Sequence, residues 1–134
     1  MLSGLKKLCS LGNAELHADL ISGLPGQKYT DVLKDIKELI AVNPHEIQLE
    51  NLKILPGTSI SVKPPAGTVW NPLPPYEVLK TKTMTARQLQ SAKHLSKMLD
   101  SYLNIPRLKN LIRFAFIRDK SSWHPRYSPS RFPE

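Results

Sequence analysis

Cysteine is almost absent from this sequence: Cys9 is the single one among 134 residues. One thiol cannot close an internal disulfide and cannot hold a metal cluster alone, so the sequence predicts a reducing, cytoplasmic setting. Leu5, Leu8 and Leu11 surround Cys9 in the sequence. These neighbours predict a packing thiol and not a reactive one.

Long apolar runs are also missing, and no stretch approaches the roughly 20 apolar residues that cross a bilayer. The first residues, 1–11, lack the long apolar core of a secretory signal. The four histidines are scattered without the spacing of metal ligands. We therefore expect no membrane span and no metal site built from this chain.

Positive charge is abundant, with a formal net charge of +8. Much of the excess follows Lys80, at Arg107, Lys109, Arg113, Arg118, Lys120, Arg126 and Arg131. Such a surface attracts anions, although a solvated basic face is the reading that we favour. Aromatic residues are sparse in this region, so a nucleic-acid surface that stacks bases is not indicated.

The first half of the chain has the pattern helix, strand, tight loop, helix, strand. We predict a helix over 2–11, a strand over 16–22 and a glycine loop at 23–26. A helix over 31–42, with Thr30 as N-cap, and a strand over 46–54 follow. A crossover of this length favours two parallel neighbouring strands.

The second half is divided by its prolines. Residues 56–76 predict an extended surface loop, and helices are predicted from Thr85 to about residue 104 and over 107–118. We expect little order after Asp119. The predicted units are a barrel part, a connecting loop, a helical extension and a tail, at 1–58, 59–84, 85–118 and 119–134.

Alternation along the two strands separates apolar from polar side chains. One face carries Leu16, Ala18, Leu20, Ile47 and Leu49, and the other carries His17, Asp19, Ile21, Gln48 and Glu50. Two interpretations fit this pattern. Either the polar face lines the interior of a barrel, with a ligand site at the carboxyl ends of the strands, or it is the wet face of a half-exposed sheet. The pattern alone leaves both open.

Three segments carry a resemblance to radical S-adenosylmethionine enzymes. They are residues 16–27 (LHADLISGLPGQ), 43–58 (NPHEIQLENLKILPGT) and 74–81 (PPYEVLKT). The first two are similar to late barrel strands of oxygen-independent coproporphyrinogen oxidases. All three resemble the cobalamin-binding magnesium-protoporphyrin ester cyclase group, in the same order. The resemblance extends over about residues 12–105.

This resemblance implies an α/β fold, the C-terminal part of a partial TIM-like (β/α) barrel with parallel strands, followed by a helical extension. It implies S-adenosylmethionine and a 4Fe-4S cluster as cofactors of the complete enzyme, with cobalamin as a further candidate. By resemblance, the cofactor-binding residues are Ile21, Gly23, Leu24, Pro25 and Gln48. The substrate cavity, for a small organic molecule such as a tetrapyrrole, is assigned to His17, Asp19 and Glu50. No catalytic residue is assigned.

The sequence departs from the family at its central motif, because it lacks the Cys-x-x-x-Cys-x-x-Cys loop that holds the cluster. We therefore expect that this chain does not cleave S-adenosylmethionine alone and that its partner is the N-terminal half of the enzyme. It would be a gene fragment, a split subunit or a mis-started reading frame. The alternatives are a non-catalytic basic module that binds an anionic partner or nucleic acid, and a remnant without activity.

Overall fold

The computed structural model describes residues 2–118, so the prediction for the tail at 119–134 lies outside the described residues. The elements are α1 (Leu2–Leu11), β1 (His17–Ser22), α2 (Tyr29–Val42), β2 (Glu46–Asn51), α3 (Ser59–Val62), β3 (Val69–Trp70), β4 (Val78–Lys80), α4 (Ala86–Met98), a π-helical turn η1 (Leu99–Leu103) and α5 (Pro106–Arg118). No helix among these is long and apolar enough to span a bilayer.

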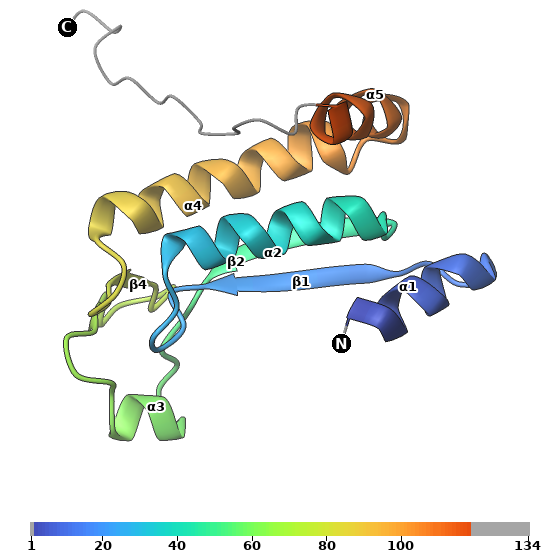
Figure 1. Ribbon diagram of the computed structural model, residues 1–134. Helices are drawn as coiled ribbons and strands as arrows, with labels where there is room; N and C mark the ends of the chain where they lie inside the picture. The colour runs from blue at the N-terminus through green and yellow to red at the C-terminus, as the bar shows by residue number, and fades with distance from the viewer. Residues whose placement is uncertain (1, 119–134) are drawn as a thin grey trace, which may run out of the picture.

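The parallel pairing predicted for the first two strands is confirmed. His17 stands opposite Glu46, and the register continues without a break to Ser22 opposite Asn51. Both α2 and α4 lie on the same side of this sheet (Figure 1), with α2 packed on β1 and α4 packed on β2. The fold is therefore mixed α/β, with one face of a two-stranded parallel sheet covered by helices.

The core lies between this face and the two helices. Ile47 and Leu49 are 1% and 2% exposed, and they pack in one cluster with Ile36 of α2 and with Leu89 and Leu95 of α4. Burying a side chain of this size stabilises the fold by roughly 1.5–3 kcal/mol relative to leaving it in water. The apolar sides of α2 and α4 thus pack against the apolar face of the strands and form one layer of core.

Helix α2 begins earlier than predicted, at Tyr29, and Thr30 is not its N-cap. The backbone N–H of Lys28 donates to Oδ2 of Asp31 at 2.8 Å, which holds the entry to the helix. Asp31 also places negative charge in the first turn, where the helix dipole favours it. At the other end Asn43 adopts a left-handed φ of 64° and its N–H donates to the Leu39 carbonyl.

The segment after β2 is more structured than the predicted loop over 56–76. Strand β2 ends at Asn51, and Lys53 then pairs with Glu77 in an antiparallel bridge. The helix α3 and the antiparallel pair β3–β4 occupy this region. The sequence pattern missed these elements because each is too short to show a period.

Helix α4 has the predicted capping box. Gln88 N–H donates to Thr85 Oγ1 at 3.3 Å, and Thr85 N–H donates to Gln88 Oε1 at 2.9 Å. The helix then widens into η1, where Asn104 N–H donates to the Leu99 carbonyl. This wider turn keeps Leu99 and Leu103 buried together before Pro106 begins α5.

Candidate functional site

The candidate site is the sheet face opposite the helices. It carries the side chains of His17, Asp19, Ile21, Glu46, Gln48 and Glu50, which alternate with the buried positions of the same strands. All but Glu46 are exposed. Within residues 2–118 no element covers this face, since α2 and α4 both lie on the other side (Figure 1).

The structure confirms the sequence prediction that five of these side chains share a face, namely His17, Asp19, Ile21, Gln48 and Glu50, and it adds Glu46. The enclosed chamber is not formed by the described residues. Two strands alone cannot enclose a cavity, so one face of this sheet is open. A barrel with a polar interior closes only when several further strands curve the sheet around it. The described part of the chain thus presents the wet-face arrangement that the pattern had left open.

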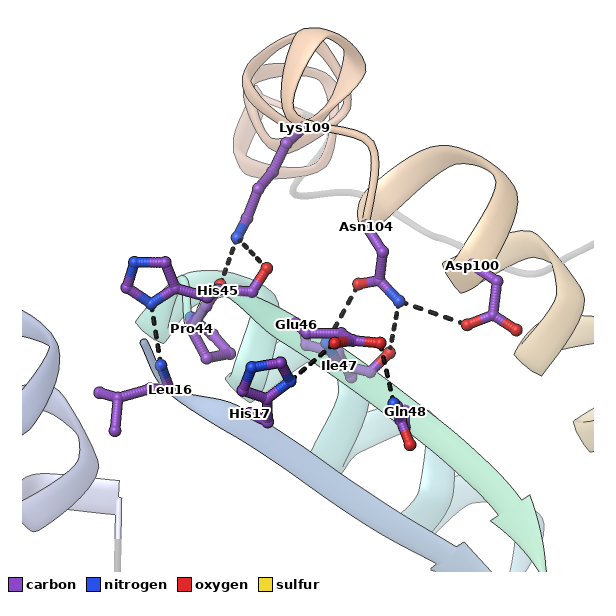
Figure 2. Close-up of polar contacts among 10 residues, drawn as sticks. All are labelled: Leu16, His17, Pro44, His45, Glu46, Ile47, Gln48, Asp100, Asn104 and Lys109. Atoms are coloured by element: carbon purple, nitrogen blue, oxygen red, sulfur yellow. Dashed lines mark hydrogen bonds and ion pairs between the residues drawn. The ribbon is translucent and has the colours of Figure 1, made fainter. Parts of the chain in front are cut away.

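At the start of the strands a histidine and a carboxylate meet. His17 Nδ1 lies 2.6 Å from Glu46 Oε2, and Gln48 Nε2 donates to Glu46 Oε1 at 2.8 Å (Figure 2). These contacts, the Gln48 hydrogen bond first, lower the pKa of Glu46 from its ordinary value against a smaller effect of burial. A neutral His17 that donates from Nδ1 carries its lone pair on Nε2, where it can accept a proton.

The other two acidic side chains of the face are not paired with each other. Asp19 stands opposite Gln48 and has no hydrogen bond or ion pair among the described residues. Glu50 stands opposite Ile21, and its Oε2 lies 3.1 Å from Lys53 Nζ. An exposed ion pair of this kind contributes about 0–1 kcal/mol. The face therefore offers separate acceptors and no carboxylate dyad.

The predicted cofactor loop is held by a residue that the site prediction missed. Gln27 Oε1 accepts the backbone N–H groups of Gly23 at 2.9 Å and Leu24 at 3.2 Å, while its Nε2 donates to the Ile21 carbonyl at 3.1 Å. Gln27 is the last residue of the sequence LPGQ, and its position beside the glycine loop was the sequence signal that could have indicated this role. The amide N–H groups of Gly23 and Leu24 are thus satisfied within the loop, and the side chains of Leu24 and Pro25 are exposed.

Gly23 itself is buried and packs against the helix. A Cβ at this position would lie 3.1 Å from Leu89 Cδ2, and the backbone φ of +88° is one that L side chains rarely adopt. The glycine is therefore required for the close approach of the loop to α4. Its assigned role in cofactor binding is separate from this packing role.

A polar network on the helix side was also missed. Ser22 Oγ donates to Asn51 Oδ1 at 2.5 Å, and Asn51 Nδ2 donates to Glu77 Oε1 at 2.9 Å and to the Leu89 carbonyl at 3.3 Å. Lys93 Nζ lies 2.7 Å from Glu77 Oε2. Ser22 and Asn51 lie at the ends of their strands, on the face that is otherwise apolar. Polar residues at these positions were the one sequence signal for this network.

His45 has a structural role at the opposite end of the sheet. Its Nδ1 accepts the Leu16 N–H at 3.0 Å, so the ring proton of the neutral form is on Nε2 (Figure 2). Lys109 of α5 donates to the carbonyls of Pro44 and His45. These contacts fasten α5 to the loop that precedes β2.

Cys9 is partly buried and free. In residues 2–118 no three side chains of the histidine, cysteine, aspartate or glutamate type gather in a group that could hold a metal ion.

Comparison with known families gives the following match. The model of DUF4080, described as a protein of unknown function, matches residues 66–124. This range begins before β3 and runs through α4 and η1 to a point beyond α5, and it does not include β1 or β2. No curated protein and no solved structure matches the chain.

Proposed function

We propose that this chain supplies two adjacent strands and the C-terminal helices of a radical S-adenosylmethionine enzyme, and that its polar sheet face forms part of the cofactor and substrate chamber. The observation that carries the proposal is the contrast between the two faces of the β1–β2 sheet. One face is packed under helices, and the other presents polar side chains at alternate positions, with Ile21 as an apolar exception. A (β/α) barrel likewise has its helices on the outside, and its ligands bind at the carboxyl ends of its strands.

The outer edge of β1 supports the same proposal. The carbonyls of Leu16 and Ser22 point toward the β2 side, where they accept N–H groups of residues around β2. Because backbone groups alternate along a strand, those of His17, Asp19 and Ile21 point to the opposite edge. No described strand pairs there. A further parallel strand at this edge would begin to curve the sheet and enclose the polar face.

Ile21 is the best-placed residue for an adenine ring. Its side chain is 44% exposed on the otherwise polar face, next to the outward-pointing Leu24 and Pro25. An apolar side chain in this position can pack against a flat ring, while Gln48 offers an amide on the same face. These residues fit part of an S-adenosylmethionine site. Cobalamin would be an additional group only on the basis of the resemblance.

The residues of this chain do not fit a 4Fe-4S cluster. Such a cluster takes several thiolate ligands, and the chain has one cysteine. In this proposal the cluster ligands come from the remaining part of the enzyme, and no step of the reaction is assigned to this chain through the cluster. The chain would position the cofactor and contact a small organic substrate, a tetrapyrrole being one candidate.

His17 and Asp19 would face that substrate. The Glu46 carboxylate orients the His17 ring through its contact with Nδ1. The other ring nitrogen, Nε2, is then the atom of His17 that can take or return a proton. Asp19 and Glu50 would accept hydrogen bonds from polar groups of the substrate. The roles proposed here are positioning and proton transfer, and the common face of His17, Asp19 and Glu50 supports them because all three could contact one substrate.

The test combines this chain with a polypeptide that carries the three-cysteine part of the barrel, reconstituted without oxygen. We expect release of 5′-deoxyadenosine on reduction with S-adenosylmethionine. Ile21→Glu should reduce the release strongly, while Leu79→Glu should not, although Leu79 is equally exposed at 46%. An assembly that forms and gives no 5′-deoxyadenosine, or equal loss in both variants, would contradict the proposal.

A further inference from the structure

The outer edge of β2 is paired by a side chain and not by a strand. Asn104 Oδ1 accepts the Ile47 N–H at 3.0 Å, and Asn104 Nδ2 donates to the Ile47 carbonyl at 3.0 Å (Figure 2). The carboxamide therefore makes the two bonds that a neighbouring strand residue would make. This edge accepts an amide group that presents an acceptor and a donor side by side.

Leu49 is the next residue whose backbone points to that edge. In a parallel pair alternate residues face opposite edges, so Gln48 faces β1, whereas Ile47 and Leu49 face away from it. Among the described residues nothing hydrogen-bonds the N–H or the carbonyl of Leu49, although this residue is 2% exposed. Buried backbone groups are nearly always paired, so the N–H and the carbonyl of Leu49 need a partner.

Pairing resumes on both sides of Leu49. Asn104 engages the edge at Ile47, and the bridge between Lys53 and Glu77 engages it further along. The unpaired stretch is therefore short, with room for the backbone of one or two extended residues.

A groove of about 300 Å³ lies over this stretch. Its lining includes the Leu49 edge, Ser96 and Lys97 of α4, and Asp100 of η1. Lys93 is occupied by its ion pair with Glu77, and Asp100 Oδ1 accepts from Asn104 Nδ2 at 3.3 Å. Lys97 makes no ion pair with a described residue. The groove thus combines an unpaired backbone donor and acceptor with a lysine ammonium group.

We propose that this groove binds a short extended peptide segment of a partner protein, which pairs with Leu49 and places an acidic side chain against Lys97. Main-chain bonds of this kind are how sheet edges recognise extended peptides. Two hydrogen bonds and one exposed ion pair give weak binding, in the millimolar range for a short peptide. The inference is independent of the proposed enzyme function, because the groove lies at the edge of β2 on the helix side.

The probe is the blocked tripeptide acetyl-Val-Asp-Val-amide, titrated into the full ¹⁵N-labelled chain and followed by NMR. We expect a saturable downfield shift of the Leu49 amide, whereas the Val78 amide, already bonded to the Leu52 carbonyl, stays in place. The matching peptide with Asn in place of Asp should bind about threefold more weakly, since it loses the ion pair. Acetamide, which offers the amide group alone, should shift the Leu49 amide without saturating.

Two phenylalanine variants separate groove binding from general effects on the helix. Ser96→Phe fills the groove and should abolish the shift, while Ser101→Phe adds the same ring at an exposed site outside the groove lining and should leave it intact. Circular dichroism checks that both variants fold. A Leu49 amide that does not respond to the peptide, or that responds equally in both variants, overturns the proposal.

Hydrogen exchange gives a second readout on the unmodified chain. Without peptide, the Leu49 amide should exchange faster than that of Ile47, which Asn104 protects. Peptide should slow exchange at Leu49 alone. Slow exchange of Leu49 in the free chain would mean that the amide already has a partner, and it would equally overturn the proposal.

Discussion

The two faces of the β1–β2 sheet are built from the same six-residue strands and have opposite properties. The helix side buries Ile47 and Leu49, and the open side exposes Gln48 and Glu50, which alternate with them along the strand. The comparison teaches that folding and chemistry are divided between alternate residues of the same strands. Substitutions one position apart should therefore differ greatly in their effect on the free energy of unfolding.

The largest difference is expected between two isoleucines. Ile47→Ala removes a side chain that is 1% exposed, and it should lower the free energy of unfolding by about 3 kcal/mol through lost burial and a residual cavity. Ile21→Ala, on the open face, should cost about 0.5 kcal/mol. Urea unfolding measures both. Equal losses would show that the open face is packed against something in solution.

The next effect concerns the buried amide of the helix side. Asn51→Leu should lower the free energy of unfolding by about 2 kcal/mol, because Ser22 Oγ and Glu77 lose their partner in a region with little water. Gln48→Leu, an amide-to-leucine change on the open face, serves as the control and should cost less than about 0.5 kcal/mol. If Asn51→Leu is neutral in urea unfolding, the network contributes no net stability.

A third change extends the comparison from the faces to the edge of the sheet. Asn104→Ala removes both bonds to Ile47 and should cost about 1–2 kcal/mol in urea unfolding. It should also speed hydrogen exchange of the Ile47 amide. Asn110→Ala, at an exposed position of α5, should leave both measurements unchanged. Unchanged exchange at Ile47 in Asn104→Ala would mean that water replaces the carboxamide without loss.

The smallest effect is a pH dependence on the open face. The folded pKa of Glu46 is lowered, so its contribution to stability is present above the unfolded pKa and is lost as the pH falls through the folded pKa. Gln48→Ala removes the main cause and should raise the Glu46 pKa toward its ordinary value, as read from carboxyl NMR shifts against pH. His17→Ala removes two further causes, a hydrogen bond and a charge interaction, and should also raise the Glu46 pKa. An unchanged Glu46 pKa in either variant would contradict this assignment of causes.

Much of the fold could be predicted where its signals are local or periodic. Alternation in β1 and β2 placed Ile47 and Gln48 on opposite faces correctly, and the capping box of Thr85 marked the start of α4. The N-cap of α2 was missed because Asp31 bonds back to Lys28, and the preference of threonine for caps pointed to Thr30 instead.

The polar residues that link distant segments could not be predicted in this way. Asn104 and Ile47 are 57 positions apart, and Asn51 and Glu77 are 26 apart. A side-chain amide in the sequence does not indicate which backbone it will meet. The hydrogen bonds of Gln27 are easier to predict from the sequence, since all three join it to residues within six positions along the chain.

The sequence by itself determined which side chains share a face, because the period of a strand is a local property of the backbone. It also determined to within a few residues where α1, α2 and α5 begin and end and where α4 begins, but it did not indicate the short helix α3. The tertiary structure alone decided that α2 and α4 cover the same face and that Asn104 takes the edge of β2. The reason is that edges and faces are filled by whichever distant segment can bury its apolar side there and satisfy the exposed backbone groups at the same time.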